Sequence, residues 1–237
     1  MTADERVPDA HAPDAAWFER DPVELAPLLL GGVLRRADAR GAVALRLTEV
    51  EAYRGSDDPG AHTFRGKTAR NATMFGPGGH VYCYFTYGMH HAVNIVAGPE
   101  GSGWGVLVRA GEVIEGYELA RFRRHERRDT TIVGELARGP GNVAQALGAT
   151  LADDGAPFAQ PAGRGDPPSV DRGGPQGRIE IPAQWSFHPA AKPPPHRTGP
   201  RVGVSGPGGD AATFPWRFWI PREPSVSAYR RAKPRTR

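Results

Sequence analysis

Two strand-forming runs in the middle of the chain constrain the fold more than any other feature of the sequence. The run 81–86 (Val-Tyr-Cys-Tyr-Phe-Thr) is dense in aromatic and β-branched residues, and 91–96 is a second apolar run. The break between them contains Tyr87 and Gly88, and a short glycine-containing break of this kind is typical of a β-hairpin. The pattern therefore predicts a hairpin with its turn at Tyr87.

The rest of the chain combines short strand patterns with a few helix patterns. Further strands are expected at 33–36 and 43–49, and at 105–109, 202–204 and 216–220. Helices are expected at 23–30, after the N-cap pair Asp21-Pro22, at 112–128 and at 141–147. The segment 51–79 is polar and glycine-rich and is interpreted as loop. These elements predict an α+β fold, a single domain with a curved, mainly antiparallel sheet, a protruding β-hairpin and surrounding helices.

The 237 residues are enough for one well-cored domain, which is expected at 17–228. Residues 1–16 are expected to form a disordered N-terminal tail, and 229–237 a basic C-terminal tail. Between 156 and 177 the chain is rich in Pro, Gly, Asp and Arg and has almost no apolar residues. This segment is interpreted as a surface insertion, since too little sequence follows it to build a second core.

The composition argues against several classes of protein. No apolar stretch approaches the roughly 20 residues of a membrane span. The acidic residues among the first 14 argue against a signal peptide, so a cytoplasmic protein is expected. The single cysteine, Cys83, excludes an internal disulfide and a multi-cysteine zinc site. Gly66-Lys67-Thr68 resembles the end of a P-loop, but Ala61 stands where the partner glycine is needed. The histidines are scattered, so no metal site is expected.

The charge pattern is compatible with a nucleic-acid partner. The formal net charge is +4 and the pI is about 9.5. Basic residues cluster at 121–128 and again in the tail at 222–237. Such patches are how proteins contact phosphate backbones. The alternatives are a solvated helix face and a frayed tail.

Two acids mark a candidate site near the end of the strand expected at 43–49. If that strand continues to about Tyr53, the side chains of Glu49, Glu51 and Tyr53 alternate onto one face. A carboxylate beside aromatic residues can deprotonate a water molecule. From the residues alone either acid is a candidate, and the alternative for each is a solvated acid at a strand end.

A longer set of motifs carries a resemblance to a known family. The set is Thr48-Glu49-Val50-Glu51-Ala52-Tyr53, Ala61-His62, Arg70-Asn71, Met74-Phe75, Val81-Tyr82-Cys83-Tyr84, Tyr87-Gly88-Met89, Val93-Asn94-Ile95 and Val106-Leu107-Val108-Arg109-Ala110. Together these motifs resemble a bacterial member of the alkyladenine (3-methyladenine) DNA glycosylase family. The resemblance covers the chain from Phe18 to about Ala228 and excludes 156–177 and both termini.

The resemblance implies an enzyme of DNA base-excision repair. Such an enzyme flips alkylated or deaminated purines, of the 3-methyladenine, hypoxanthine and ethenoadenine type, out of duplex DNA. It then hydrolyses the N-glycosidic bond and leaves an abasic site. The resemblance implies a monomeric protein with double-stranded DNA containing damaged purines as its partner. No cofactor is expected, because the sequence shows no metal-ligand cluster.

The resemblance also implies roles for particular residues. Glu51 matches the family's general base, and Arg109 matches the arginine that helps to position the attacking water. The residues that match the base pocket are Tyr53, His62, Tyr84 and Asn94, those that match the intercalating tip of the hairpin are Tyr87 and Met89, and the backbone of Val202 matches a contact to the water. Each has a structural alternative, which for Arg109 is a buried ion pair at a strand end.

Two other functions remain open. One is a protein that binds distorted DNA without cutting it, for which Glu51 would be dispensable. The other is an enzyme acting on free nucleosides, which would not need Tyr87. Lys67 is the only lysine near the matched residues, so no Schiff-base lyase step is expected. The sequence assigns no proton donor for neutral leaving bases.

Overall fold

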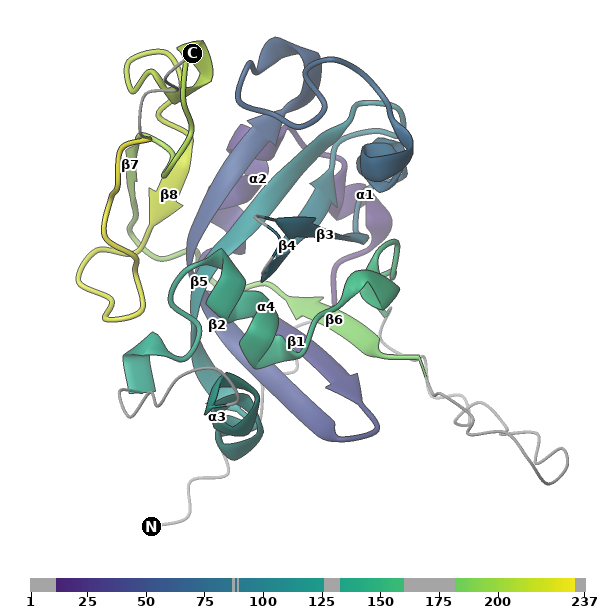
Figure 1. Ribbon diagram of the computed structural model, residues 1–237, viewed down its shortest axis with the longest axis vertical. Coiled ribbons are helices and arrows are strands. Elements are labelled where there is room, and N and C mark those ends of the chain that lie inside the picture. Colours follow the sequence, from purple (N-terminus) through teal and green to yellow (C-terminus); the bar gives the residue numbers. More distant parts are fainter. Residues whose placement is uncertain (1–11, 87, 89, 126–132, 160–181, 233–237) are drawn as a thin grey trace, which may run out of the picture.

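Two long antiparallel strands, β2 (Gly41–Arg54) and β5 (Trp104–Glu115), run side by side through the middle of the fold (Figure 1). The structure is a computed structural model that describes residues 12–86, 88, 90–125, 133–159 and 182–232. The strand order is β3 (Val81–Thr86), β4 (His90–Ala97), β5, β2, β1 (Val33–Asp38) and β6 (Gln184–His188). At the edge of the molecule β8 (Arg217–Trp219) pairs with β2, and β7 (Arg197–Gly199) pairs with β8.

Short helices and turns surround this curled antiparallel sheet. The α-helices are α1 (Ala15–Phe18), α2 (Pro22–Leu29), α3 (Tyr117–His125) and α4 (Pro140–Leu147). The 3-10 turns are η1 (Gly55–Asp57), η2 (Ala69–Phe75), η3 (Val133–Glu135), η4 (Leu151–Asp153) and η5 (Pro207–Gly209). The helices α3 and α4 lie toward one end of the long strands in Figure 1. The α+β fold with an antiparallel sheet predicted from the sequence is confirmed.

Local signals in the sequence account for the elements that were predicted correctly. The Asp21 carboxylate accepts a hydrogen bond from the Val23 amide at 2.8 Å and caps α2, with Pro22 in the first turn. The strands β3 and β4 pair in register from Val81–Ile95 to Thr86–His90, which confirms the predicted hairpin. Its turn residues Tyr87 and Met89 lie outside the described residues.

The helix expected at 112–128 is wrong in its first part. There β5 continues to Glu115, because Val113 pairs with Leu45 and adds its side chain to the core. Gly116 then adopts φ +72°, and a Cβ at this position would lie 2.0 Å from the Ala42 carbonyl oxygen. Only glycine fits this left-handed turn between strand and helix, so α3 begins at Tyr117.

Long-range packing changes four other expectations. Residues 202–203 form a turn, and 202–204 are not part of a strand, whereas β6 and β7 were not expected. The segment expected to be loop from 51 is still strand β2 as far as Arg54. The start of the expected insertion belongs to the fold, since Phe158 is buried beside Phe18 and Phe187. In the expected N-terminal tail, α1 begins at Ala15.

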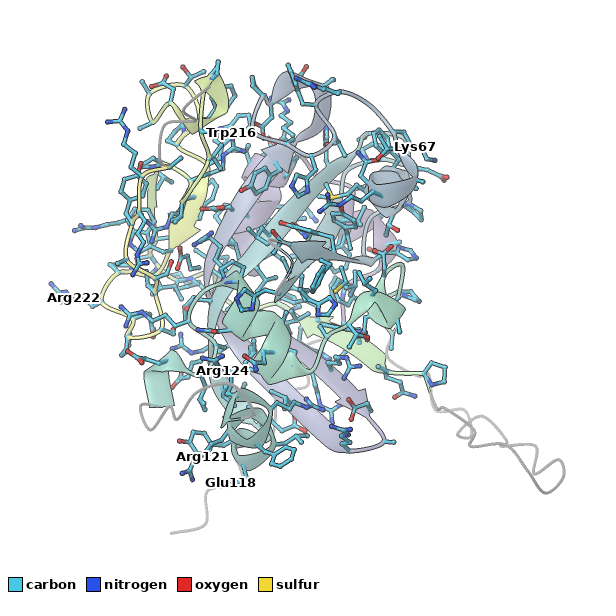
Figure 2. The ribbon with its side chains drawn as sticks, in the orientation of Figure 1. Lys67, Glu118, Arg121, Arg124, Trp216 and Arg222 are labelled. Carbon is cyan, nitrogen blue, oxygen red and sulfur yellow. The ribbon has the colours of Figure 1, made fainter. Side chains whose placement is uncertain are left out.

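The arginines of α3 hold this helix to its neighbours. Arg123 is buried and donates to the Leu147 carbonyl at the end of α4 and to Asp38. Arg124 is buried and donates to Gln145. Arg123 and Arg124 are therefore part neither of a patch that contacts phosphates nor of a solvated helix face. Figure 2 shows Arg121 projecting outward beside Glu118 at the end of α3, and 126–132 lie outside the described residues.

Within the described ranges, no helix has the length and apolar character needed to cross a membrane.

Candidate functional site

One face of the sheet collects most of the residues singled out from the sequence. Glu51 on β2 pairs with Leu107 on β5, which pairs with Asn94 on β4, which pairs with Tyr82 on β3. Residues directly opposite each other in antiparallel strands project from the same face. This cross-strand row therefore links the acid on β2 with the aromatic residues of the hairpin. The neighbouring residues Val50, Ala52, Val106 and Val108 alternate to the other face and form the main core.

The Glu51 side chain is fully buried and held from three sides. Its Oε2 accepts a hydrogen bond from the Tyr53 hydroxyl at 2.8 Å. Its Oε1 accepts one from the backbone amide of Val202 at 2.7 Å and lies 3.4 Å from Nε of Arg109. These contacts fix the orientation of the carboxylate and compensate its charge in a place shielded from water.

Glu49 is as deeply buried as Glu51, so a solvated acid at a strand end is the wrong description of it. Its Oε1 accepts hydrogen bonds from Nε of Arg109 at 2.8 Å and from Nε of Arg217 at 2.7 Å. The Ser227 amide donates to its other oxygen at 2.7 Å. The structural alternative for Arg109, a buried ion pair, is thus present in addition to its contact with Glu51.

A shift in the register between β2 and β5 directs the Arg109 side chain toward both Glu49 and Glu51. Glu49 pairs with Ala110 and the next residue, Val50, pairs with Val108, so Arg109 has no residue opposite it on β2. Such bulges redirect a side chain out of the regular pattern. Burial opposes the charged guanidinium, but the Glu51 and Glu49 carboxylates outweigh burial and raise the pKa of Arg109, which stays charged.

Tyr53 connects Glu51 to a second buried ion pair. The Arg201 guanidinium stacks on the Tyr53 ring, 4.5 Å from its centroid, and forms two hydrogen bonds to Asp58 at 2.5 and 2.6 Å. Arg201 also donates to the Ala52 carbonyl at 2.9 Å, so it fastens the turn containing Val202 to β2. Burial and the nearby Glu51 charge raise the pKa of Tyr53 well above its usual value, so its hydroxyl remains a hydrogen-bond donor.

The aromatic part of the site lies on the hairpin and on the loop that faces it. The ring of Tyr84 stacks with Tyr82 at 5.3 Å and meets the ring of His62 edge-on at 4.7 Å. Asn71 holds the His62 loop, since its amide donates to the carbonyls of His62 and Gly66. The side chain of His62 is accessible from solvent, so this cluster has an open side.

The charge state of His62 is a testable property of this cluster. Partial burial and the Arg70 charge lower the pKa of His62, and we expect a neutral imidazole at pH 7. Replacing Arg70 by Gln should raise the midpoint of its titration, because one repulsive positive charge is removed. Two-dimensional ¹H–¹⁵N spectra of the imidazole across pH 4.5–8.5 measure this midpoint. The exposed Arg65 on the same loop gives the control, Arg65→Gln, and an equal shift in both variants would contradict the assigned cause.

Asn94 is buried, and its amide donates to the Tyr82 carbonyl across the hairpin at 3.2 Å. The structure therefore gives Asn94 a structural contact and also places it in the row that contains Glu51. Tyr53, Arg109 and Val202 contact Glu51, while Tyr84 and His62 form the neighbouring aromatic cluster. Tyr87 and Met89, the residues of the expected intercalating tip, lie outside the described residues.

A surface hollow of about 600 Å³ lies apart from these residues. The hairpin residues Phe85 and His91 line one wall, and the α4 residues Ala144 and Gln145 line another. None of the residues that contact Glu51 lines this hollow. In the part of the chain that the structure describes, no group of His, Cys, Asp and Glu side chains is arranged to hold a metal ion.

Asp58, Arg201 and the role of Glu49 were not predicted from the sequence. Asp58 stands in an Asp-Asp-Pro-Gly turn and Arg201 precedes Val202, but nothing local indicates that the two side chains pair. A weak signal was available for Glu49, since alternation along β2 places it on the face of Glu51. Together these residues form a buried, charge-balanced site with an oriented carboxylate on the sheet face that also bears an aromatic cluster. Such a site can take a proton from water beside a planar ring.

The chain matches known proteins over nearly all of its length. A model of the methylpurine-DNA glycosylase family matches residues 16–224. A protein of Streptomyces avermitilis named "Putative 3-methyladenine DNA glycosylase" is 48% identical over 231 residues, which is 98% of either chain. Proteins with the same name are 48% identical over 216 residues in Leifsonia xyli, covering 90% of this chain and 91% of the relative, and 44% identical over 208 residues in Cutibacterium acnes, covering 88% and 95%. The resemblance carried by the motifs is thereby confirmed, and the chain belongs to the methylpurine-DNA glycosylase family.

Proposed function

We propose that this protein excises alkylated or deaminated purines of the 3-methyladenine, hypoxanthine and ethenoadenine type from duplex DNA, with Glu51 as the general base. One observation carries the proposal. Glu51 is a fully buried carboxylate oriented by Tyr53, Val202 and Arg109, on the sheet face that also bears the aromatic cluster. The names of the relatives and the family membership support the same reaction.

The reaction is a hydrolysis at the anomeric carbon of the damaged nucleotide. The water oxygen forms a bond to C1′ while the C1′–N bond breaks and its electron pair leaves with the base. One proton of the water passes to Glu51. The electron pair neutralises a cationic methylated base, so its departure needs no further proton. A neutral base such as hypoxanthine needs a proton as well.

The surrounding residues supply orientation and charge. As the glycosidic bond breaks, positive charge develops on the sugar, and the Glu51 carboxylate stabilises it. Arg109 and the amide of Val202 position the carboxylate and the attacking water. In our proposal Tyr53, His62, Tyr84 and Asn94 line the pocket for the flipped base, since bases are held by stacking on aromatic rings and by hydrogen bonds to their edges. Tyr87, flanked by Met89, fills the gap left in the duplex.

The test is an excision assay on duplex oligonucleotides that carry one hypoxanthine, ethenoadenine or methylated purine. We expect strand cleavage at the lesion only after treatment with hot alkali, which reveals an abasic site. Cleavage without alkali would contradict a monofunctional hydrolase. An undamaged duplex and the free damaged nucleoside are the controls, and hydrolysis of the nucleoside alone would favour a nucleoside-processing enzyme.

The competing function is recognition of distorted DNA without catalysis. Binding to the lesion duplexes with no base release from any of them would support it and would overturn our proposal. Loss of binding at higher salt is expected for both functions, so it does not distinguish between them.

A further inference from the structure

The two buried acids of β2, Glu49 and Glu51, accept hydrogen bonds from different kinds of partner. Both guanidinium Nε atoms in the cluster donate to Glu49, from Arg109 at 2.8 Å and from Arg217 at 2.7 Å. The hydrogen bonds that Glu51 accepts come from Tyr53 and Val202, and Arg109 approaches it only to 3.4 Å. Glu49 therefore takes the directional contacts of the cations, while Glu51 keeps a lone pair free for a water molecule.

The charges around Glu51 come from every element packed against it. They are Glu49 on β2, Arg109 on β5, Arg217 on β8, and Arg201 with Asp58 from the adjoining loops, while Tyr53 on β2 is a neutral titratable group that donates to Glu51. Asp58 compensates Arg201, and the two acids of β2 compensate Arg109 and Arg217. Removal of the Glu49 charge would leave one positive charge in excess beside Glu51.

We propose that Glu49 is a positioning residue for Glu51, since it holds the guanidinium groups of Arg109 and Arg217 on its own carboxylate and thereby leaves the Glu51 carboxylate available to a water molecule. This inference rests on the proposed function, in which Glu51 accepts a proton from water. The C-terminal segment also helps to hold Glu49 in place, because both the amide and the hydroxyl of Ser227 donate to its carboxylate.

The experiment compares the pH dependence of base release in single turnovers by the full chain. The substrate is a duplex with a cationic methylated purine, because its departure requires no added proton. In Glu49→Gln the acid limb of the profile should move to lower pH by about 1–2 units, since an excess positive charge favours the ionised Glu51. The plateau rate should fall, because a weaker base accepts the proton less readily.

A second variant gives a shift of opposite sign. Arg217→Met removes one of the two cations held by Glu49, so the acid limb should move to higher pH. Damage to the fold alone has no reason to move the two profiles in opposite directions. If Glu49→Gln does not fold, Arg217→Met still decides the question. Glu49→Asp keeps the charge and should keep the acid limb near its wild-type position, although its shorter side chain lowers the rate.

The matched control is Asp153→Asn, which makes the same chemical change in a different buried pair. Asp153 is bound to Arg36 and Trp185, and its loss should reduce stability without moving the acid limb. The ¹³C titration of the Glu51 carboxyl group provides a readout that does not depend on turnover. Its midpoint should move to lower pH in Glu49→Gln and to higher pH in Arg217→Met.

An acid limb that stays in place in both Glu49→Gln and Arg217→Met would overturn the positioning role. Failure of the proposed function has a different signature, because then the wild-type protein releases no base, or Glu51→Gln keeps the acid limb. In that case the ¹³C titration still tests whether Glu49 controls the ionisation of Glu51.

Discussion

Replacing Glu51 by Gln is expected to slow base release in single turnovers by roughly 10²- to 10⁴-fold, the usual contribution of a general base. Glutamine has the same shape but does not accept a proton from water. Its carbonyl oxygen can still accept the Val202 amide, and its NH₂ group can donate to the Tyr53 oxygen, so the local contacts have acceptable replacements. Binding of the lesion duplex should therefore be retained, which a gel-shift or fluorescence-anisotropy titration measures.

The control for this variant is Glu118→Gln. Glu118 projects from α3 into solvent in Figure 2, and its side chain is 81% exposed, so the same chemical change there should leave both rate and binding unaltered. A Glu51→Gln protein that releases bases at the wild-type rate would remove Glu51 from the mechanism. Loss of binding together with loss of turnover would point to a pocket that has collapsed.

The parts of this fold that were predictable from the sequence depend on local chemistry. The hairpin of β3 and β4 follows from two β-rich runs around a glycine, and α2 follows from an N-cap and a proline. The shared face of Glu49, Glu51 and Tyr53 follows from the period of two in a strand. Neighbours in the chain decide these features, so a sequence pattern is sufficient to find them.

The other features depend on residues that are distant in the chain. Arg109 reaches both acids because the register of β2 and β5 shifts there, and no pattern within β5 marks that position. The segment at Val202 has the composition of a strand, but Arg201 pairs with Asp58 from 143 residues away and turns the chain toward Glu51. The choice of Glu51 over Glu49 came from family resemblance, because an alternating pattern does not distinguish two acids on the same face.

The buried pair of Asp58 and Arg201 should therefore have the largest effect on stability. Both side chains are almost completely shielded from solvent, and Arg201 also donates to the carbonyls of Ala52 and Gly208. In Asp58→Asn the guanidinium charge stays buried without its partner, and breaking a buried pair in this way costs about 3–5 kcal/mol. Urea unfolding monitored by tryptophan fluorescence measures the loss of stability. Trp216, labelled in Figure 2, reports on this region, because the centroid of its ring lies 5.4 Å from Cζ of Arg201.

Arg201→Met and the double variant separate the charge pair from the packing of these loops. Asp58→Asn leaves the buried charge of Arg201 without its partner, and Arg201→Met leaves the buried charge of Asp58 without its partner. The double variant, Asp58→Asn with Arg201→Met, removes both charges. The double variant should therefore be less destabilised than the sum of the two single variants, with a coupling energy of about 0.5–3 kcal/mol. The exposed pair of Glu118 and Arg121 is the reference, and its removal should cost less than about 1 kcal/mol.

The same variants should also slow base release, because Arg201 stacks on Tyr53 and precedes Val202, and both of these residues donate to Glu51. When rates are corrected for the folded fraction, Asp58→Asn should still be slower than wild type. Full activity of the folded fraction would show that the pair only stabilises the fold. Reduced activity of the folded fraction would mean that this long-range ion pair holds both donors in place, so that the stability of these loops and the orientation of the Glu51 carboxylate depend on the same contact.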